Sequence, residues 1–150
     1  MAEMLKKTGE FNNLIKQMKL KYLKEINGLP CELDSFSEQD RISFRWVFTD
    51  INDTRNFEPV YKDAKRQQTT CCGFALSFYD EQKSAKKRLL ELTKDKENLF
   101  KKLGTHIAVG NLEKKDGISN KSNSKGHFEH FEYDNIVLNT KFEIVEKVAI

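Results

Sequence analysis

The second half of the chain carries three β-rich segments in succession, with no helical pattern between them. They are THIAVGNL (105–112), HFEHFEYDNIVL (127–138) and KFEIVEKVAI (141–150). Strands that follow one another without a helix between them are usually antiparallel neighbours, because a parallel pair needs a long crossover. This succession therefore predicts an antiparallel sheet in the C-terminal half, against which the other elements must pack.

Two earlier segments also have the pattern of strands. RISFRWVFTD (41–50) alternates large apolar side chains with smaller or polar ones, which is typical of a half-buried strand. A helix beginning at Ser37 is the competing interpretation, and the Phe, Trp, Val and Thr content favours the strand. CCGFALSF (71–78) has the composition of a buried strand, with Gly73 permitting a bulge.

Helical periodicity occurs in three places. Residues 3–26 place Phe11, Leu14, Ile15, Met18 and Tyr22 on one face of a helix. Residues 80–92 form a second amphipathic pattern, and a shorter helical segment, 97–103, ends at Gly104.

The order of these elements predicts a single α+β domain over residues 1–150. We expect an N-terminal helix (3–26) and a mixed or antiparallel sheet of about five strands, with one further helical segment on one face. The segment 114–126 is rich in Gly, Ser, Asn and Lys. Because it has little to bury, it is predicted to be a mobile loop.

Charge and cysteine content exclude few classes of protein. The net charge is +3, with +3 in residues 1–27 and −3 in residues 127–150, which does not identify a partner. The three cysteines have no zinc-binding spacing, and no apolar run is long enough to cross a bilayer. The polar N-terminus does not resemble a secretory leader. We therefore expect a cytoplasmic protein with free thiols, no membrane contact, and no metal or cofactor.

The densest group of titratable side chains lies in HFEHFE (127–132). In a strand, His127 and Glu129 share one face, and His130 and Glu132 share the other. A His beside a Glu can act as a base with an orienting carboxylate, or bind a metal if His106 joins them. The alternative is an edge strand whose polar groups lie in water.

Arg45, Ser77 and either Glu129 or Glu132 occur in that order on successive expected strands. This order resembles the Arg–Ser–Glu order of ADP-ribosyltransferase folds. The resemblance implies that Arg45 and Ser77 help to hold NAD and that a Glu acts in transfer. The family's Ser-Thr-Ser-like strand is represented here by the single Ser77 of ALSF, and its Glu-x-Glu or Gln-x-Glu pair by Glu-His-Phe-Glu.

Three functions remain open, and whether the protein is an enzyme is not decided. The first is an interaction or accessory protein that docks to another protein or to itself through Leu20, Leu23 and Ile26, which lie off the main apolar stripe. The second is the nucleotide-using enzyme, with Arg45, Ser77, His106, Glu129 and Glu132 as candidate catalytic residues. The third is nucleic-acid binding through lysines of the N-terminal helix and the 114–126 loop. These lysines are Lys16, Lys19, Lys114, Lys115, Lys121 and Lys125.

Overall fold

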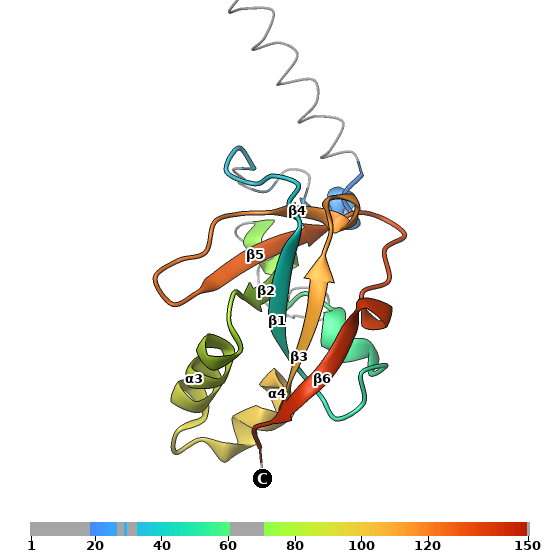
Figure 1. Cartoon of the computed structure of the whole chain (residues 1–150). Helices are drawn as coiled ribbons and strands as arrows, with labels where there is room; N and C mark the ends of the chain where they lie inside the picture. The colour runs from blue at the N-terminus through green and yellow to red at the C-terminus, as the bar shows by residue number, and fades with distance from the viewer. Residues whose placement is uncertain (1–18, 27–28, 30–32, 61–70, 150) are drawn as a thin grey trace, which may run out of the picture.

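The computed structural model describes residues 19–26, 29, 33–60 and 71–149. Its centre is a six-stranded sheet with the strand order β4-β5-β2-β1-β3-β6 (Figure 1). The strands are β1 (Arg41–Val47), β2 (Leu76–Tyr79), β3 (His106–Leu112), β4 (Gly117–Ser119), β5 (His127–Glu132) and β6 (Phe142–Lys147). All neighbouring strands are antiparallel. The α+β class and the antiparallel arrangement are therefore confirmed.

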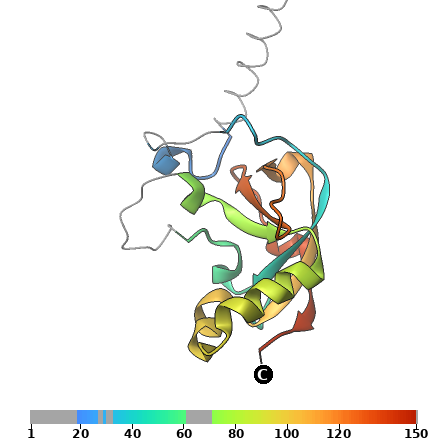
Figure 2. The same ribbon diagram turned by 90° about the vertical axis from the view of Figure 1, so that its left-hand side faces the viewer.

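Short helices connect the strands, and one longer helix covers part of the sheet (Figure 2). The α-helices are α2 (Leu23–Ile26), α3 (Gln82–Thr93) and α4 (Phe100–Leu103). The 3-10 helices are η1 (Thr54–Phe57), η2 (Cys71–Phe74), η3 (Glu97–Leu99), η4 (Lys114–Asp116) and η5 (Asn139–Lys141). The helical segments expected at 80–92 and 97–103 are confirmed, and α4 ends at Gly104 with φ of 130°.

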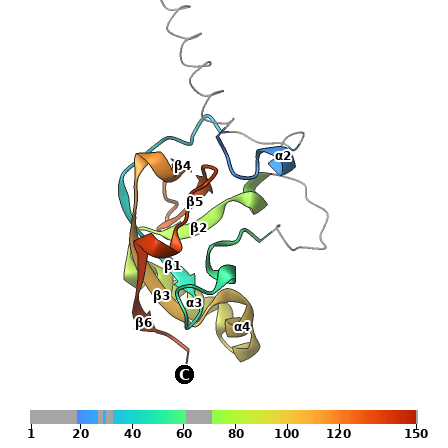
Figure 3. The same cartoon turned by 90° about the vertical axis from the view of Figure 1, so that its right-hand side faces the viewer.

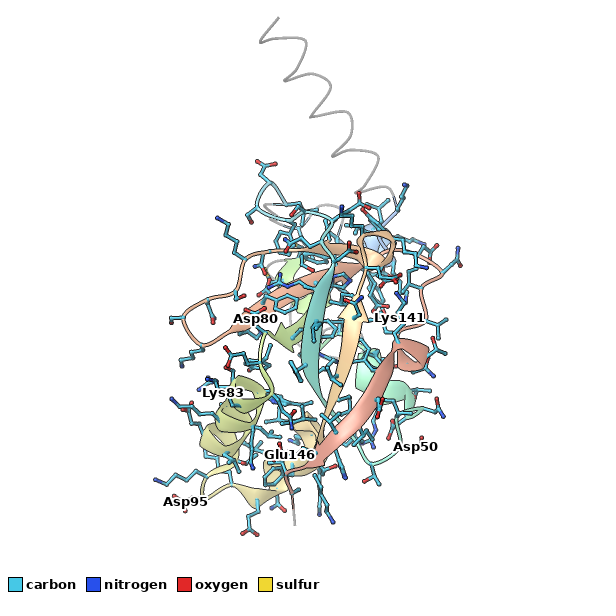
Figure 4. All side chains as sticks on the ribbon, viewed as in Figure 1. Asp50, Asp80, Lys83, Asp95, Lys141 and Glu146 are labelled. Carbon is cyan, nitrogen blue, oxygen red and sulfur yellow. The ribbon has the colours of Figure 1, made fainter. Side chains whose placement is uncertain are left out.

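Helix α3 packs on one face of the sheet because its apolar side chains recur every four residues. Ala85 and Leu89 are fully buried. The Trp46 indole donates a hydrogen bond from Nε1 to the Ala85 carbonyl at 2.8 Å, which ties β1 to the helix. Glu146 of β6, labelled in Figure 4, pairs with Lys86 at 2.6 Å. These contacts link α3 to β1 and β6, while the helix packs on β1, β2 and β3.

The larger apolar core lies on the opposite face of the sheet. Its buried members are Val47, Leu76, Phe78, Ala108, Leu112, Phe128, Leu138 and Phe142. In β1, Ser43 and Val47 point to this face and are fully buried, whereas Phe44 and Trp46 are half-buried beside α3. Ile42 is 64% exposed, because α3 does not reach it. The alternation in β1 thus predicted the strand, but its large apolar side chains do not mark the more buried face.

The helix expected over 3–26 is not continuous at its C-terminal end. Leu20 forms an isolated antiparallel bridge with Tyr133, and the helix α2 starts at Leu23. Leu20 and Ile26 are buried with Phe74 of η2, so α2 lies beside the start of β2 (Figure 3). Around Leu20 the backbone hydrogen-bonds to the end of β5 and the residues that follow it, in place of the hydrogen bonds of a helix. Residues 3–18 lie outside the described part.

The segment 114–126 contains a helix and a strand, and the expectation that it has nothing to bury is wrong. Asp116, Ile118 and Ser119 are at most 3% exposed. Strand β4 pairs with β5, and Ser37 bridges to the outer edge of β4. Arg41 donates to the Asn120 carbonyl at 2.8 Å, which attaches the turn after β4 to β1.

The cysteines differ from the expectation of free thiols. Cys71 is disulfide-bonded, and Cys72 is an exposed thiol. Cys31 lies outside the described residues. Within the ranges that the structure describes, no helix is long and apolar enough to cross a membrane.

Candidate functional site

The central strands β1 and β2 separate after a short contact, and an arginine side chain enters the gap. They pair at Phe44 and Tyr79, whereas β1 pairs with β3 along all its residues. The Arg45 guanidinium donates from Nε to the Asn56 carbonyl and from Nη1 to the Ser77 carbonyl, both at 2.7 Å. The side chain thus takes the place of hydrogen bonds that two fully paired strands would make.

Two adjoining cavities follow this gap, and we call them together the β1–β2 groove. The larger, of about 550 Å³, extends toward η1 and α4, and the smaller, of about 390 Å³, extends toward α3 and the turn before β5. Both are lined by Trp46, Ser77 and Tyr79, so the two cavities share a floor. Each has a volume within the range of about 300–1,000 Å³ that is usual for small-ligand sites.

Positive charge dominates the lining of this groove. The basic residues that line it are Arg45, Arg55 and Lys102 in the larger cavity, and Arg88 and Lys125 in the smaller. The lining contains one carboxylate, Glu58. Arg55 is neutralised by Asp53 at 2.7 Å, and Arg88 has Glu91 at 3.4 Å. Lys102 and Lys125 make no ion pair with a described residue. The groove therefore attracts anions.

Arg45 is the most unusual of these cations. Its hydrogen-bond acceptors are two neutral carbonyl groups, and the carboxylate whose charge acts on it is that of Glu132, with which no direct ion-pair contact is formed. Burial lowers its pKa from 12.5 to about 10, which still leaves it charged at neutral pH. Buried charges in proteins are normally paired, because desolvation without a counter-charge is costly. The buried carboxylate of Glu132, on the other face of the sheet, partly compensates the charge of Arg45.

Aromatic rings form the rest of the groove floor. The ring centroids of Trp46 and Tyr79 are 5.5 Å apart, and those of Tyr79 and His127 are 5.4 Å apart in an edge-to-face arrangement. Burial raises the pKa of Tyr79 to about 12 and lowers the pKa of His127, so both rings are uncharged at neutral pH. The floor can therefore contact a planar ring beside the anion-binding cations.

The structure places three of the residues named from the sequence on adjacent strands. Arg45 on β1, Ser77 on β2 and Glu129 on β5 lie on adjacent strands, and Ser77 and Glu129 are directly opposed in the β2–β5 ladder. Ser77 is exposed in the groove, and Glu129 is half-buried on the same sheet face but lines neither cavity. Arg45 lies with Ser43 and Val47 on the opposite face of β1, so its side chain reaches the groove only through the gap between β1 and β2. His106 lies elsewhere, at the start of β3, where its Nδ1 is 2.7 Å from the Thr105 hydroxyl.

Glu132 and His130 face the opposite side of the sheet. They are buried, because β5 lies between β4 and β2. The alternative of an edge strand with its polar groups in water is therefore wrong. His130 Nδ1 is 2.7 Å from the Ser119 hydroxyl, and Glu132 Oε2 accepts a 2.6 Å bond from Lys21. Burial lowers the pKa of His130 to about 4 and raises the pKa of Glu132.

Ser119, His130 and Asp116 together have the residue types of a hydrolase triad. All three are at most 2% exposed, and none of them lines a cavity that the structure describes. A nucleophile needs access to its substrate. These residues therefore stabilise the junction of β4 and β5 and do not form an active site.

The remaining candidates are spread over the molecule. Of the six lysines, only Lys125 lines the groove; Lys114 and Lys115 are in η4, and Lys16 lies outside the described residues. Leu20 and Ile26 are 4% and 6% exposed, so the expectation that they are free for a partner is wrong. Leu23 is 36% exposed.

Sequence reasoning missed the aromatic and cationic lining of the groove. Trp46 was assigned to a strand without a role, and Tyr79 fell just after the strand expected at 71–78. Arg88 and Lys102 belong to helices that had no predicted neighbour. The sequence pattern that indicates the aromatic part of the lining is an aromatic residue close after Arg45 and after Ser77, in the segments RWV and SFY. Nowhere in the described residues do three His, Cys, Asp or Glu side chains gather as metal ligands. Comparisons with protein-family models, curated proteins and solved structures give no match.

Proposed function

We propose that the chain binds NAD in the β1–β2 groove and transfers its ADP-ribosyl group. The observation that carries the proposal is the Arg45 guanidinium, which lines the groove and donates to the Ser77 carbonyl, with Glu129 opposite Ser77 on the next strand. This is the set of residues whose order resembles that of ADP-ribosyltransferases. The structure supports the resemblance because three residues that are far apart in the chain lie on neighbouring strands.

Each part of the groove suits one part of such a ligand. A guanidinium binds phosphate through two parallel hydrogen bonds, and Arg45 has an Nη2 that no described residue accepts from. Trp46 and Tyr79 offer apolar surface to a planar base. The Ser77 hydroxyl is exposed and is able to hydrogen-bond a ribose or phosphate oxygen. Together these contacts fix the ligand across the two cavities.

The transfer step assigned to Glu129 is a substitution at the anomeric carbon of the ribose. The bond between this carbon and the nicotinamide nitrogen breaks, and nicotinamide leaves with the electron pair. The carboxylate of Glu129 stabilises the positive charge that develops on the sugar. A nucleophile on the acceptor, or water, then bonds to the carbon and loses its proton, for which Glu129 is the base.

Separate measurements of binding and turnover test this proposal. NAD binding is measured by calorimetry, and nicotinamide release by chromatography. Arg45→Lys is expected to weaken binding about tenfold or more, since it loses charged hydrogen bonds worth roughly 1.5–3 kcal/mol each. Glu129→Gln is expected to keep binding and to lower turnover by about 10²-fold or more.

Glu143→Gln provides the control, because Glu143 is an exposed carboxylate on β6, which is separated from the β2–β5 pair by β1 and β3. It should change neither quantity. The proposal is refuted if NAD fails to bind at millimolar concentration, or if Glu129→Gln and Glu143→Gln have equal turnover. Competition by a single-stranded oligonucleotide with no nicotinamide release would instead favour the nucleic-acid alternative.

The docking function expected from the sequence loses much of its support. Two of its three residues, Leu20 and Ile26, are in the chain's own core. A cytoplasmic location is also weakened, since the disulfide at Cys71 favours an oxidising compartment. Mass analysis after alkylation without reduction, on protein from the native cell, tests this: three alkylated cysteines would restore the cytoplasmic assignment.

A further inference from the structure

The loop that follows β1 is built around one buried asparagine side chain. Asn56 lies in η1 and is 1% exposed, although it borders the larger cavity of the β1–β2 groove. Its Oδ1 accepts a hydrogen bond from the Phe48 N–H at 2.7 Å, and its Nδ2 donates to the Asp50 carbonyl at 2.8 Å and to the Ile51 carbonyl at 3.2 Å. The backbone of this loop, in which Figure 4 labels Asp50, therefore depends on the Asn56 amide for hydrogen bonds that a helix or sheet supplies elsewhere.

The same residue holds Arg45 through its backbone carbonyl. The Asn56 N–H donates to the Asp53 carbonyl at 3.0 Å, and the Asn56 carbonyl accepts from Arg45 Nε at 2.7 Å. The backbone and side-chain polar groups of Asn56 thus all have partners, so its carbonyl cannot turn away from Arg45 without breaking other hydrogen bonds. The loop fixes the position of this acceptor before any ligand binds.

Two further kinds of contact orient the Arg45 guanidinium. Its Nη1 donates to the Ser77 carbonyl at 2.7 Å, and its Cζ lies 5.9 Å from the Phe57 ring centroid and 5.5 Å from that of Phe78. Phe57 follows Asn56 directly in the chain, so the same loop supplies two of these contacts. With Nε and Nη1 engaged, Nη2 is the guanidinium nitrogen that makes no hydrogen bond with a described residue.

We propose that Asn56 is a positioning residue of the β1–β2 groove: by holding Arg45 Nε, it fixes the guanidinium in the orientation that binds a ligand phosphate. An arginine side chain that is free before binding loses rotamer freedom in the complex, and this loss weakens affinity. Arg45 has lost that freedom already in the folded chain, because two segments of backbone hold it. The inference rests on the NAD proposal for the identity of the ligand, whereas the hold on Arg45 exists without a ligand.

A double-mutant cycle separates this positioning from general damage to the loop. NAD affinity is measured by calorimetry for the native protein, Asn56→Ala, Arg45→Lys and the double variant. Asn56→Ala should weaken binding about fivefold or more, because a released Arg45 must be ordered by the ligand. In the Arg45→Lys background the same change should cost less than about twofold, since a flexible ammonium has no fixed orientation to lose. Equal weakening in both backgrounds, or none in the native one, would overturn the proposal.

Asn139→Ala is the matched control, because it also removes an asparagine hydrogen bond to this loop. Asn139 Nδ2 donates to Asn52 Oδ1 at 2.8 Å, and neither residue lines the β1–β2 groove. This variant should keep the NAD affinity within about twofold of the native value, as expected for an exposed contact away from the groove. A loss as large as that of Asn56→Ala would overturn the specific role of Asn56.

NMR of the ligand-free protein tests the hold on Arg45 directly, so this inference and the NAD proposal can fail separately. The Arg45 Nε–H should exchange with solvent at least about tenfold more slowly than the Nε–H of Arg88, whose described hydrogen bond is made by Nη1. In Asn56→Ala this protection should be lost. Equal exchange of the two groups in the native protein would overturn the proposal even if Asn56→Ala does not fold, and so would unchanged protection in a folded Asn56→Ala. If NAD fails to bind but the exchange rates are as expected, the NAD proposal is refuted and the hold of Asn56 on Arg45 is supported.

Discussion

His130 makes the stability of this protein depend on pH in the mildly acidic range. The ring is 1% exposed, its Nδ1 is 2.7 Å from the Ser119 hydroxyl, and its Nε2 has no hydrogen-bond partner in the described structure. Burial disfavours the charged ring and lowers its pKa from 6.5 to about 4, although the charge of Asp116 opposes part of this shift. The folded protein therefore holds His130 neutral at a pH where the unfolded chain has already taken up a proton.

The sign and size of the effect follow from that difference. Between pH 6.5 and 4 the unfolded state binds more protons, so the free energy of unfolding falls as the pH falls. At 1.36 kcal/mol per pKa unit, the loss contributed by His130 on going from pH 7 to pH 4 is about 3 kcal/mol. Glu132 acts in the opposite direction, because its pKa is raised on folding and its ionisation at higher pH opposes the folded state. A variant of His130 is therefore needed to isolate this contribution.

The contribution of His130 is measured by urea unfolding, followed by circular dichroism at pH 7, 5.5 and 4. The native protein and His130→Gln are compared. The stability difference between the two proteins should change by about 3 kcal/mol in favour of the variant between pH 7 and pH 4. His106→Asn removes a half-buried histidine from β3 and should retain the full acid-dependent loss. Parallel curves for the native protein and His130→Gln would refute the reasoning. If His130→Gln does not fold, NMR titration of the native imidazole decides, and a midpoint near 6.5 would refute it.

Two further substitutions test the junction of η4, β4 and η5. Lys141→Met removes the counter-charge of Asp116, which is 1% exposed and 2.5 Å from Lys141 Nζ, and should lower the free energy of unfolding in urea by about 3 kcal/mol or more. Lys83→Met is the control: its lysine is 84% exposed in its ion pair, so the loss should be no more than about 0.5 kcal/mol. Equal losses would contradict the burial of Asp116. Gly117 has φ of 156°, and a Cβ there would lie 2.1 Å from the Phe131 carbonyl oxygen, so Gly117→Ala should lose more than about 4 kcal/mol or fail to fold; native-like thermal unfolding of this variant would contradict the β4–β5 pairing.

Local patterns predicted many of the elements in the described structure. The alternation in residues 41–50 and the four-residue spacing in residues 80–92 each gave the correct element, now β1 and α3. The succession of late strands without a long helix predicted an antiparallel sheet correctly, but of these strands only β3 and β6 are neighbours, whereas β5 lies between β4 and β2. Such patterns are informative because they depend on residues within one or two turns of each other. Arg45, Ser77 and Glu129 were also named from their order along the chain.

Tertiary structure decided what depends on residues far apart in sequence. Strand β4 has three residues, too few to show a period, and forms because β5 pairs with it. From their spacing, Leu20 and Ile26 were expected on an exposed part of a helix. In the structure they are buried in a cluster with Phe74, a contact with a distant part of the chain that spacing does not show. The groove exists because β1 and β2, which are adjacent in the sheet, pair over only a short length. The Lys21–Glu132 ion pair joins residues 111 positions apart. Interactions of this kind gain free energy only after the chain has folded, so no local pattern records them.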